Sequence, residues 1–383
     1  MRTLRLNSRL LFALAVLLII AARQVSTEQR PSVLRPGLRL YAYVGNTGDG
    51  TVTAVDLASL QAVATIPVGP APSGLRAHPR RNEIWGVSST EGDAWIIDAP
   101  TGAVSARIPI GAGVFALDFS PDGKFAYAAA STAGTVVAID CDARRIVATA
   151  RPGREPWIVR LAPDAKSLLV TLRGANAVAV LDAATLKPLH TIPVAPQPEQ
   201  LFIMPDGKKA FVSAAGSQQI SAIDLEQKKL LTNLTLPARA SAFVFNTREE
   251  KAELYALTPE AHGVTVLDTW RNELGDTRIL GSAPSSGVYT ANGDLLLVAD
   301  SAANQIQLML AEFRQPLRTI PVGQRPVNVR FTDDERLLLV VNEASEDLTV
   351  ISGLSQSLAQ RRQPPFTLIP LGARPRDLAI KLF

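Results

Sequence analysis

The feature that most constrains the fold of this 383-residue chain is an internal repeat. Its clearest marker is an aspartate that follows apolar residues and recurs at a spacing of 42, at Asp56, Asp98, Asp140, Asp182 and Asp224. The series continues 44 residues later at Asp268, and the surrounding pattern continues without an aspartate at Leu310 and Ser352. A short IPVG-like segment follows each marker, which gives eight copies. A period of this length predicts a propeller, a solenoid or another array of stacked units.

Each copy contains four short apolar segments. In residues 115–153, an alternating segment leads into a Pro-Asp-Gly-Lys turn at 121–124, and three further segments follow, separated by polar or glycine-containing turns. The segments have the length and alternation of strands, and none shows helical spacing. The repeated aspartates stand at strand ends, where an Asx-type turn explains them. Four antiparallel strands in one repeat predict a propeller blade, because a solenoid repeat would have one strand or none.

The two ends of the chain predict how the ring closes. The first unit starts at about Leu38, and its segment LYAYVGN matches the second strand of the other units, whereas residues 378–383 match a first strand. We therefore expect the last strand to complete the amino-terminal blade, which removes the free edges of the ring. The predicted fold is all-β, with residues 39–383 forming a single propeller of eight four-stranded antiparallel blades. Seven blades is the alternative, because the units at 243–287 and 329–377 are irregular in length.

Several short motifs accompany the repeat. Tyr43 to Asn46 reads YVGN, the PDGK turn recurs, and the IPVG segment is followed two or three residues later by proline. With these motifs the repeat resembles the YVTN family of bacterial β-propellers over residues 39–383. The resemblance implies the propeller fold. It implies little about function, because members of that family bind varied ligands.

Residues 1–23 are predicted to be a signal peptide or an N-terminal membrane anchor. Arginines precede an apolar run from Leu10 to Ala22, which suits a signal peptide and is shorter than the roughly 20 residues of a membrane span. The cleavage region is poor, so a retained anchor formed by residues 10–22 in the inner membrane stays open. Residues 24–38 are polar and carry two prolines, which is typical of a linker. We expect export to the periplasm or the outer cell surface, with membrane contact only through this segment.

Composition excludes several classes of function. The chain has 39 basic and 35 acidic side chains. Residues 1–30 hold five basic side chains and one acidic side chain, so the rest of the chain has 34 basic and 34 acidic side chains. A neutral body predicts no nucleic-acid partner. The single cysteine, Cys141, excludes an intramolecular disulfide and a cysteine-cluster metal site. Three histidines at unrelated registers predict no metal site. We expect no cofactor, and we expect a monomer.

The candidate binding face carries the loops after each fourth strand and those between the second and third strands. Next to the loop proline, the chemistry differs from unit to unit, as expected of a site on a symmetric scaffold. The residues that follow that proline, or its equivalent, are Ser73, Phe115, Trp157, Glu199, Ser241, Ser285, Val327 and Arg376. The other loops add polar residues such as Glu343, without the dense acidic loop that would predict a calcium site.

Two groups of residues on this face are candidate ligand-binding residues. Arg325, Arg374 and Arg376 come from units that meet across the ring closure, and with Arg239 they predict a basic patch able to bind a carboxylate or phosphate. Beside Glu155, aromatic surface for a flat ligand or peptide is offered by Phe115 and Trp157. His262 is the one histidine expected on this face.

Three functions are compatible with these features. The favoured one is an exported, non-enzymatic propeller that binds a protein partner or a small anionic ligand through its loop face. The second is a periplasmic oxidoreductase-like propeller that binds haem or a quinone, for which His262 is the sole well-placed histidine. The third is a lactone hydrolase, since phosphogluconolactonases resemble YVTN propellers. No Ser-His-Asp or Cys-His arrangement is visible, so the sequence leans against an enzyme.

Overall fold

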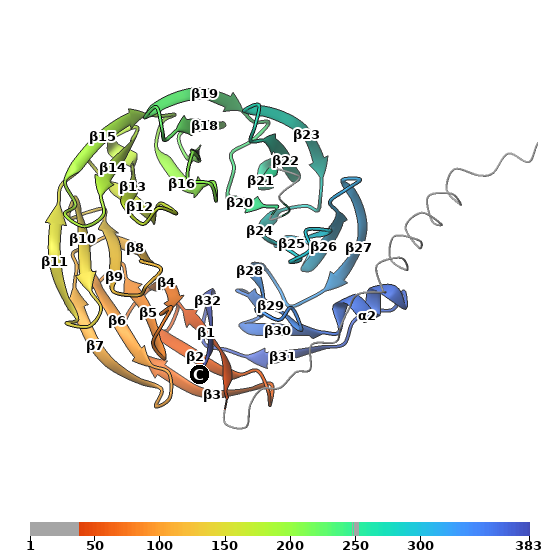
Figure 1. The fold of residues 1–383 in the computed structure, drawn as a ribbon. Helices are drawn as coiled ribbons and strands as arrows, with labels where there is room; N and C mark the ends of the chain where they lie inside the picture. The colour runs from red at the N-terminus through yellow and green to blue at the C-terminus, as the bar shows by residue number, and fades with distance from the viewer. Residues whose placement is uncertain (1–37, 247, 249–252) are drawn as a thin grey trace, which may run out of the picture.

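The protein is a closed ring of eight blades, each a four-stranded antiparallel sheet (Figure 1). The computed structural model describes residues 38–246, 248 and 253–383, so the predicted signal or anchor segment and almost all of the predicted linker lie outside the described residues. The eight-bladed prediction is confirmed, and the seven-bladed alternative is wrong. No helix in the described part of the chain is long and apolar enough to cross a membrane.

Blades are numbered here by chain order, and their strands are given from the centre of the ring outward. Blade one contains β32 (Pro375–Leu382), β1 (Leu40–Asn46), β2 (Thr51–Asp56) and β3 (Gln61–Pro67). Blade two contains β4 (Pro72–Ala77), β5 (Glu83–Ser88), β6 (Asp93–Asp98) and β7 (Ala103–Pro109). Blade three contains β8 (Val114–Phe119), β9 (Phe125–Ala130), β10 (Thr135–Asp140) and β11 (Arg145–Ala150). Blade four contains β12 (Pro156–Leu161), β13 (Ser167–Leu172), β14 (Ala177–Asp182) and β15 (Pro188–Pro193).

The second half of the ring repeats this arrangement. Blade five contains β16 (Pro198–Ile203), β17 (Lys209–Ala214), β18 (Gln219–Asp224) and β19 (Lys229–Thr235). Blade six contains β20 (Ala242–Phe245), β21 (Glu253–Thr258), β22 (Gly263–Asp268) and β23 (Glu273–Ile279). Blade seven contains β24 (Pro284–Tyr289), β25 (Leu295–Asp300), β26 (Gln305–Leu310) and β27 (Gln315–Pro321). Blade eight contains β28 (Pro326–Phe331), β29 (Leu337–Asn342), β30 (Asp347–Ser352) and β31 (Phe366–Pro370). A short helix, α2 (Leu354–Ala359), lies between β30 and β31 and accounts for the irregular length of that unit.

The predicted closure of the ring is confirmed. Strand β32 pairs antiparallel with β1 in a register that runs from Leu40 opposite Leu382 to Asn46 opposite Pro375. The backbone N–H of Arg39 donates to the carbonyl of Phe383 at 2.6 Å, and the reciprocal bond measures 2.9 Å. Figure 1 shows these two ends of the propeller side by side. The carboxy-terminal strand therefore supplies the inner strand of the blade that the amino-terminal strands begin.

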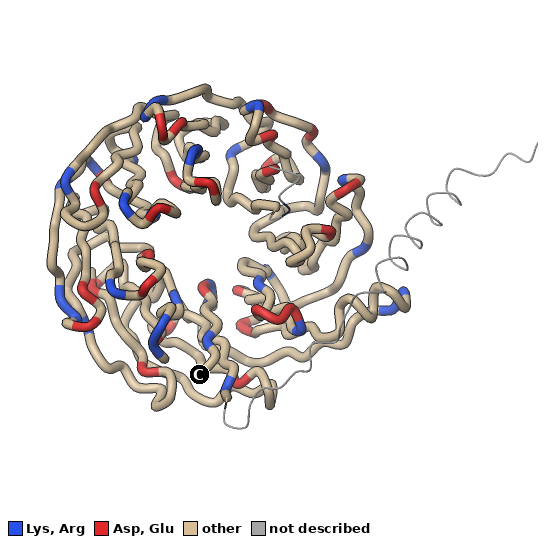
Figure 2. Tube along the Cα trace, viewed as in Figure 1, with Lys and Arg blue, Asp and Glu red and all other residues tan. Residues whose placement is uncertain are grey.

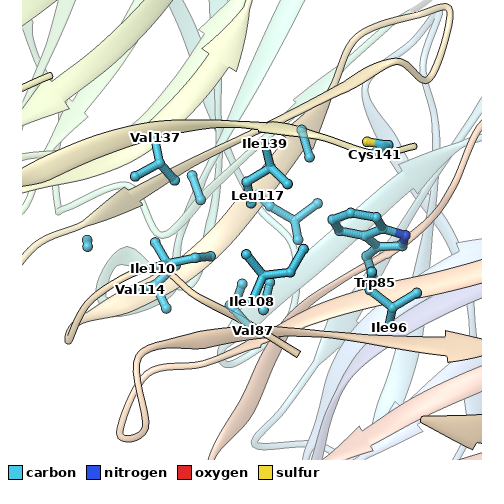
Figure 3. Packing of buried hydrophobic residues seen from close by; sticks show 14 residues of the cluster. Trp85, Val87, Ile96, Ile108, Ile110, Val114, Leu117, Val137, Ile139 and Cys141 are labelled. Atoms are coloured by element: carbon cyan, nitrogen blue, oxygen red, sulfur yellow. The ribbon is translucent and has the colours of Figure 1, made fainter. Parts of the chain in front are cut away.

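The hydrophobic core lies between neighbouring blades, because each middle strand is buried on both of its faces. All six residues of β5 are buried, whereas the outer strand β11 alternates between exposed and half-buried residues. Figure 3 shows one such cluster between blades two and three, where Trp85 packs near Leu117 and Ile139. Burial of apolar side chains between blades is the main force that holds the ring together.

Cys141 belongs to the same cluster and is fully buried. Burial raises the pKa of this thiol to about 12, so it stays protonated and is a poor nucleophile. The preceding Asp140 accepts backbone hydrogen bonds from Asp142 at 2.9 Å and Ala143 at 2.8 Å. These bonds form the Asx-type turn that the sequence predicts for the repeated aspartates.

Candidate functional site

Two sets of loops meet on one face of the ring, at the amino-terminal ends of the inner strands. In blade one, the Gly50 carbonyl between β1 and β2 accepts hydrogen bonds from the backbone of Val68 at 2.9 Å and Gly69 at 3.1 Å, just after β3. Across the closure, the N–H of Thr47 donates to the carbonyl of Arg374 at 3.0 Å. The loops are thus bonded to one another and form a continuous rim.

This rim surrounds a cavity of about 590 Å³, called here the mouth cavity. Its volume lies within the range of small-molecule sites, roughly 300–1,000 Å³. Most of its lining is polar, and the residues are Thr47, Ala71, Pro72, Ser73, Ser89, Phe115, Ser285, Ser301, Arg325, Val327, Glu343, Arg376 and Asp377. The Ser73 hydroxyl is buried and has no hydrogen-bond partner among the described residues.

Three of the four predicted arginines converge on one carboxylate at the edge of this cavity. Glu343, just after β29, is only 3% exposed. Its Oε1 accepts a hydrogen bond from Arg376 Nε at 2.7 Å and lies 4.0 Å from Arg374 Nε. Arg325 Nε lies 3.1 Å from Oε2 in an orientation that gives an ion pair and not a directional hydrogen bond. Glu343, Arg325, Arg374 and Arg376 together are called the arginine patch.

The charge of the arginine patch does not cancel. Three guanidinium groups share one carboxylate, which leaves two positive charges in excess within the patch; Asp377, which also lines the cavity, is not part of it. The side chains of Arg325, Arg374 and Arg376 remain 59%, 67% and 51% exposed, so their outer N–H groups can reach a ligand. Glu343 holds the three forks in place, and an incoming carboxylate or phosphate can accept their free hydrogen bonds.

An aromatic surface lies on other blades of the same rim. The rings of Phe115 in β8 and Trp157 in β12 have centroids 4.3 Å apart and planes tilted by 38°. The guanidinium carbon of Arg173, in the 3₁₀ helix η2 (Arg173–Ala175), lies 4.3 Å from the centroid of the Trp157 ring. Phe115 lines the mouth cavity, Trp157 packs beside it, and Glu155 is exposed next to them. Flat apolar groups stack well on such a surface.

Two further predicted residues, Arg239 and His262, do not line the mouth cavity. Arg239 lies between blades five and six, where its Nη2 donates to Glu260 at 2.9 Å. His262 follows the 3₁₀ helix η3 (Pro259–Ala261), and its Nδ1 donates to the Ser282 carbonyl at 2.5 Å. Within the described residues, no three His, Cys, Asp or Glu side chains are grouped to hold a metal ion. Figure 2 shows basic and acidic residues interspersed around the ring, as the neutral body requires.

The backbone of the rim is left-handed at most of the positions before the loop proline. The φ angles of Glu155, Arg325 and Arg374 are 51°, 56° and 51°, and Ala71 and Gln197 adopt the same conformation. Such angles cost a residue other than glycine roughly 1 kcal/mol. Since they recur at positions with unrelated side chains, the blade-to-blade turn imposes them, and they do not mark the site.

The position of a residue within the repeat predicts much of the lining of the mouth cavity. Five of the residues that follow the loop proline line it, namely Ser73, Phe115, Ser285, Val327 and Arg376. Sequence reasoning missed the part played by Glu343, and it did not single out Ser89 or Ser301. All three stand just after a second strand of a blade, and that repeated position is the signal that could have found them.

Fold and site together define an eight-bladed β-propeller with a polar, arginine-bearing cavity at one mouth of its ring. The family profile of YNCE-like β-propellers matches residues 82–362, and the chain belongs to that family. This match confirms a propeller family, while the narrower resemblance to YVTN proteins stays a prediction. No curated protein matches this chain.

Solved structures share the fold. One is dihydro-heme d1 dehydrogenase NirN in complex with DHE, with a TM-score of 0.75 and 17% identity, over 89% of this chain and 74% of that one. Another is the hydrazine synthase of Kuenenia stuttgartiensis, with a TM-score of 0.57 and 18% identity, over 73% of this chain and 95% of that one. At this identity the likeness concerns the fold alone.

Proposed function

We propose that this protein is an exported, non-enzymatic propeller that binds a small anionic ligand at its mouth cavity. The observation that carries the proposal is the convergence of Arg325, Arg374 and Arg376 on the buried carboxylate of Glu343. Export rests on the predicted signal or anchor segment, which would place the propeller in the periplasm or at the outer cell surface. We further propose that it acts as a monomer, without contact to nucleic acid.

The chemistry of the cavity indicates the kind of ligand. An acidic group would sit on the arginine patch and accept hydrogen bonds from the outer N–H groups of the guanidinium forks. A flat or apolar part of the same ligand would contact Phe115, with Trp157 beside it. An aromatic acid meets all of these requirements, and an acidic segment of a partner protein would use the same arginines.

The arginines of the mouth cavity give the direct test. In the double variant Arg325→Ala/Arg376→Ala, we expect every aromatic carboxylate or sulfonate that binds the wild type to bind at least about 150-fold more weakly, because two charged hydrogen bonds contribute about 1.5–3 kcal/mol each. Isothermal titration calorimetry with a panel of such acids measures the change. The matched control is Arg239→Ala, since Arg239 is as exposed and lies outside the cavity. Unchanged affinity in the double variant, or turnover of a lactone by the wild type, would contradict the proposal.

A cofactor-binding propeller is the second candidate, since the fold resembles a dehydrogenase solved with DHE. The mouth cavity does not suit haem, because its lining among the described residues contains no histidine, methionine, cysteine or tyrosine to serve as an axial ligand. His262 keeps one ring nitrogen open but lies outside that lining. We expect protein purified from its native host to show no absorbance above the protein band; a stoichiometric visible band would favour this candidate instead.

A further inference from the structure

A second group of arginines lies inside the ring, on the inner strands. Pairing with the second strand sets Arg76 opposite Trp85, Arg160 opposite Leu169 and Arg330 opposite Leu339. Since these partners are equivalent positions of the repeat, the three arginines stand at one level of the ring. They come from blades two, four and eight, and are called here the channel arginines. The inner strands that carry them face the centre of the ring in Figure 1.

The wall at this level has a charged side and an apolar side. Between the channel arginines lie two aspartates, Asp118 of blade three at the same level and Asp377 of blade one. The charged side therefore runs from blade eight to blade four, through Arg330, Asp377, Arg76, Asp118 and Arg160. In blade one the position at this level is Ala379, and Asp377 stands two residues nearer the mouth. The equivalent positions of blades five, six and seven are apolar and hold Phe202, Val244 and Val288.

The two aspartates bond to the backbone of the next blade and do not pair with the channel arginines. Asp377 Oδ2 accepts from the N–H of Gly74 at 2.6 Å, and Asp118 Oδ2 accepts from that of Leu161 at 3.0 Å. Among the described residues, no ion pair within 4.0 Å joins a carboxylate to any channel arginine. None of the three guanidinium groups thus contacts a carboxylate among the described residues.

This arrangement is electrostatically costly without an anion. The channel arginines are half-buried, and burial lowers the pKa of Arg160 to about 10, with the positive charge of Arg76 lowering it further. Burial and the charge of Arg76 also lower the pKa of Arg330. Arg76 is therefore within electrostatic range of both of the others. The charges of Asp118 and Asp377 partly offset these pKa shifts, and Arg160 Nη1 donates a hydrogen bond to the carbonyl of Val159 at 2.9 Å. Three arginines against two aspartates leave one positive charge in excess on this wall, which an anion can balance.

A second cavity adjoins this level at the opposite end of the inner strands. It measures about 380 Å³ and is lined by Asp118 and Arg160 on one side and by apolar residues such as Phe202 and Leu201 on the other. The mouth cavity reaches Asp377 from the other end. Arg160 therefore borders the second cavity, and Asp377, on the same charged wall, borders the mouth cavity.

We propose that the ring holds a second anion site, in which a phosphate-type oxyanion binds between Arg76, Arg160 and Arg330. The forks of guanidinium groups suit the oxygens of such an anion, which would neutralise the cluster. The second cavity offers apolar surface to an organic group attached to the phosphate. This site is separate from the arginine patch and shares no residue with it.

The test uses the full chain carrying Arg325→Ala/Arg374→Ala/Arg376→Ala, so that the arginine patch cannot contribute. We expect inorganic phosphate at about 10 mM to raise the Tm of this variant by about 2 °C or more over chloride at equal ionic strength. Adding Arg76→Met should raise the Tm without phosphate, because one of three like charges is removed, and should abolish the phosphate effect. Arg160→Met is the second variant, should Arg76→Met fail to fold.

Phenyl phosphate distinguishes the two sources of the anion. Binding tighter than that of inorganic phosphate indicates an organic phosphate whose apolar part occupies the second cavity, and equal binding indicates a free oxyanion; both support the site. The proposal is overturned if phosphate gives no rise beyond chloride, or if the rise survives in folded Arg76→Met and Arg160→Met variants.

Discussion

Deletion of residues 375–383 is expected to abolish cooperative folding of the whole propeller. The deletion removes β32, whose Leu378 and Ala379 are fully buried or nearly so, and it leaves β1 as an open edge. It also removes Asp377, which bonds to the backbone of blade two at Gly74. Since a domain is usually stable by only roughly 5–15 kcal/mol, the loss of an inner strand and of ring closure exceeds what the remaining blades can offset. Thermal unfolding followed by circular dichroism should show no sharp transition.

A circular permutant is the control for this truncation, because it also ends at residue 374 but keeps the strand at the other end of the chain. Residues 375–383 are placed before Arg39 and joined to it by Asn-Gly, with the chain ending at residue 374. Because Arg39 and Phe383 exchange both backbone hydrogen bonds, a two-residue type I′ turn can link them. We expect this permutant to unfold within a few degrees of a variant that carries residues 38–383 in the native order. A truncated chain that melts cooperatively at the same temperature would show that closure by β32 contributes little.

The sequence predicts this fold well because each blade repeats the same short pattern of strand and turn residues. Asp140 and its equivalents predict a turn, and the turn forms with the bonds that an Asx residue makes. The repeat continues through Leu310 and Ser352 after the aspartate is lost, since strand alternation and not the marker residue forms the sheet. For the same reason, the inserted helix α2 alters the length of one unit without changing the number of blades.

The sites are less predictable, because they depend on contacts between blades. Register alone identifies Arg325 and Arg376 as loop residues of one face, but their meeting at Glu343 needs the closed ring. Arg239 has the same register as Arg325, yet it pairs with Glu260, which no repeat pattern indicates. The sequence does not reveal the channel arginines, because they belong to strands and follow no motif. Only the folded ring shows that three blades place them at one level.

Substitution of Gly86 by alanine is expected to destabilise the protein by about 3 kcal/mol, the upper part of the range for overpacking a core. Gly86 in β5 is paired directly with Trp95 in β6, and the indole lies over the glycine. A Cβ at Gly86 would stand 2.2 Å from one ring carbon of Trp95 and 2.3 Å from another. Trp95 is fully buried among Tyr43 and Ile97, so it has no free space to move into. Chemical denaturation gives the free energy of unfolding, and near-ultraviolet circular dichroism reports the packing of the indole.

The matched control is Gly275→Ala, in the outer strand β23. Neither glycine has a positive φ, and a Cβ at Gly275 would meet its nearest atom, the carbonyl oxygen of Val266, at an ordinary 3.4 Å. There alanine should be neutral or stabilise by up to about 1 kcal/mol, because it reduces the freedom of the unfolded chain. The contrast isolates the contact with Trp95 from the general cost of removing a glycine. If both variants unfold with the same free energy, the indole is not locked over Gly86. Strand β5, which leads directly to Ser89 at the mouth, is then less rigid than its burial implies.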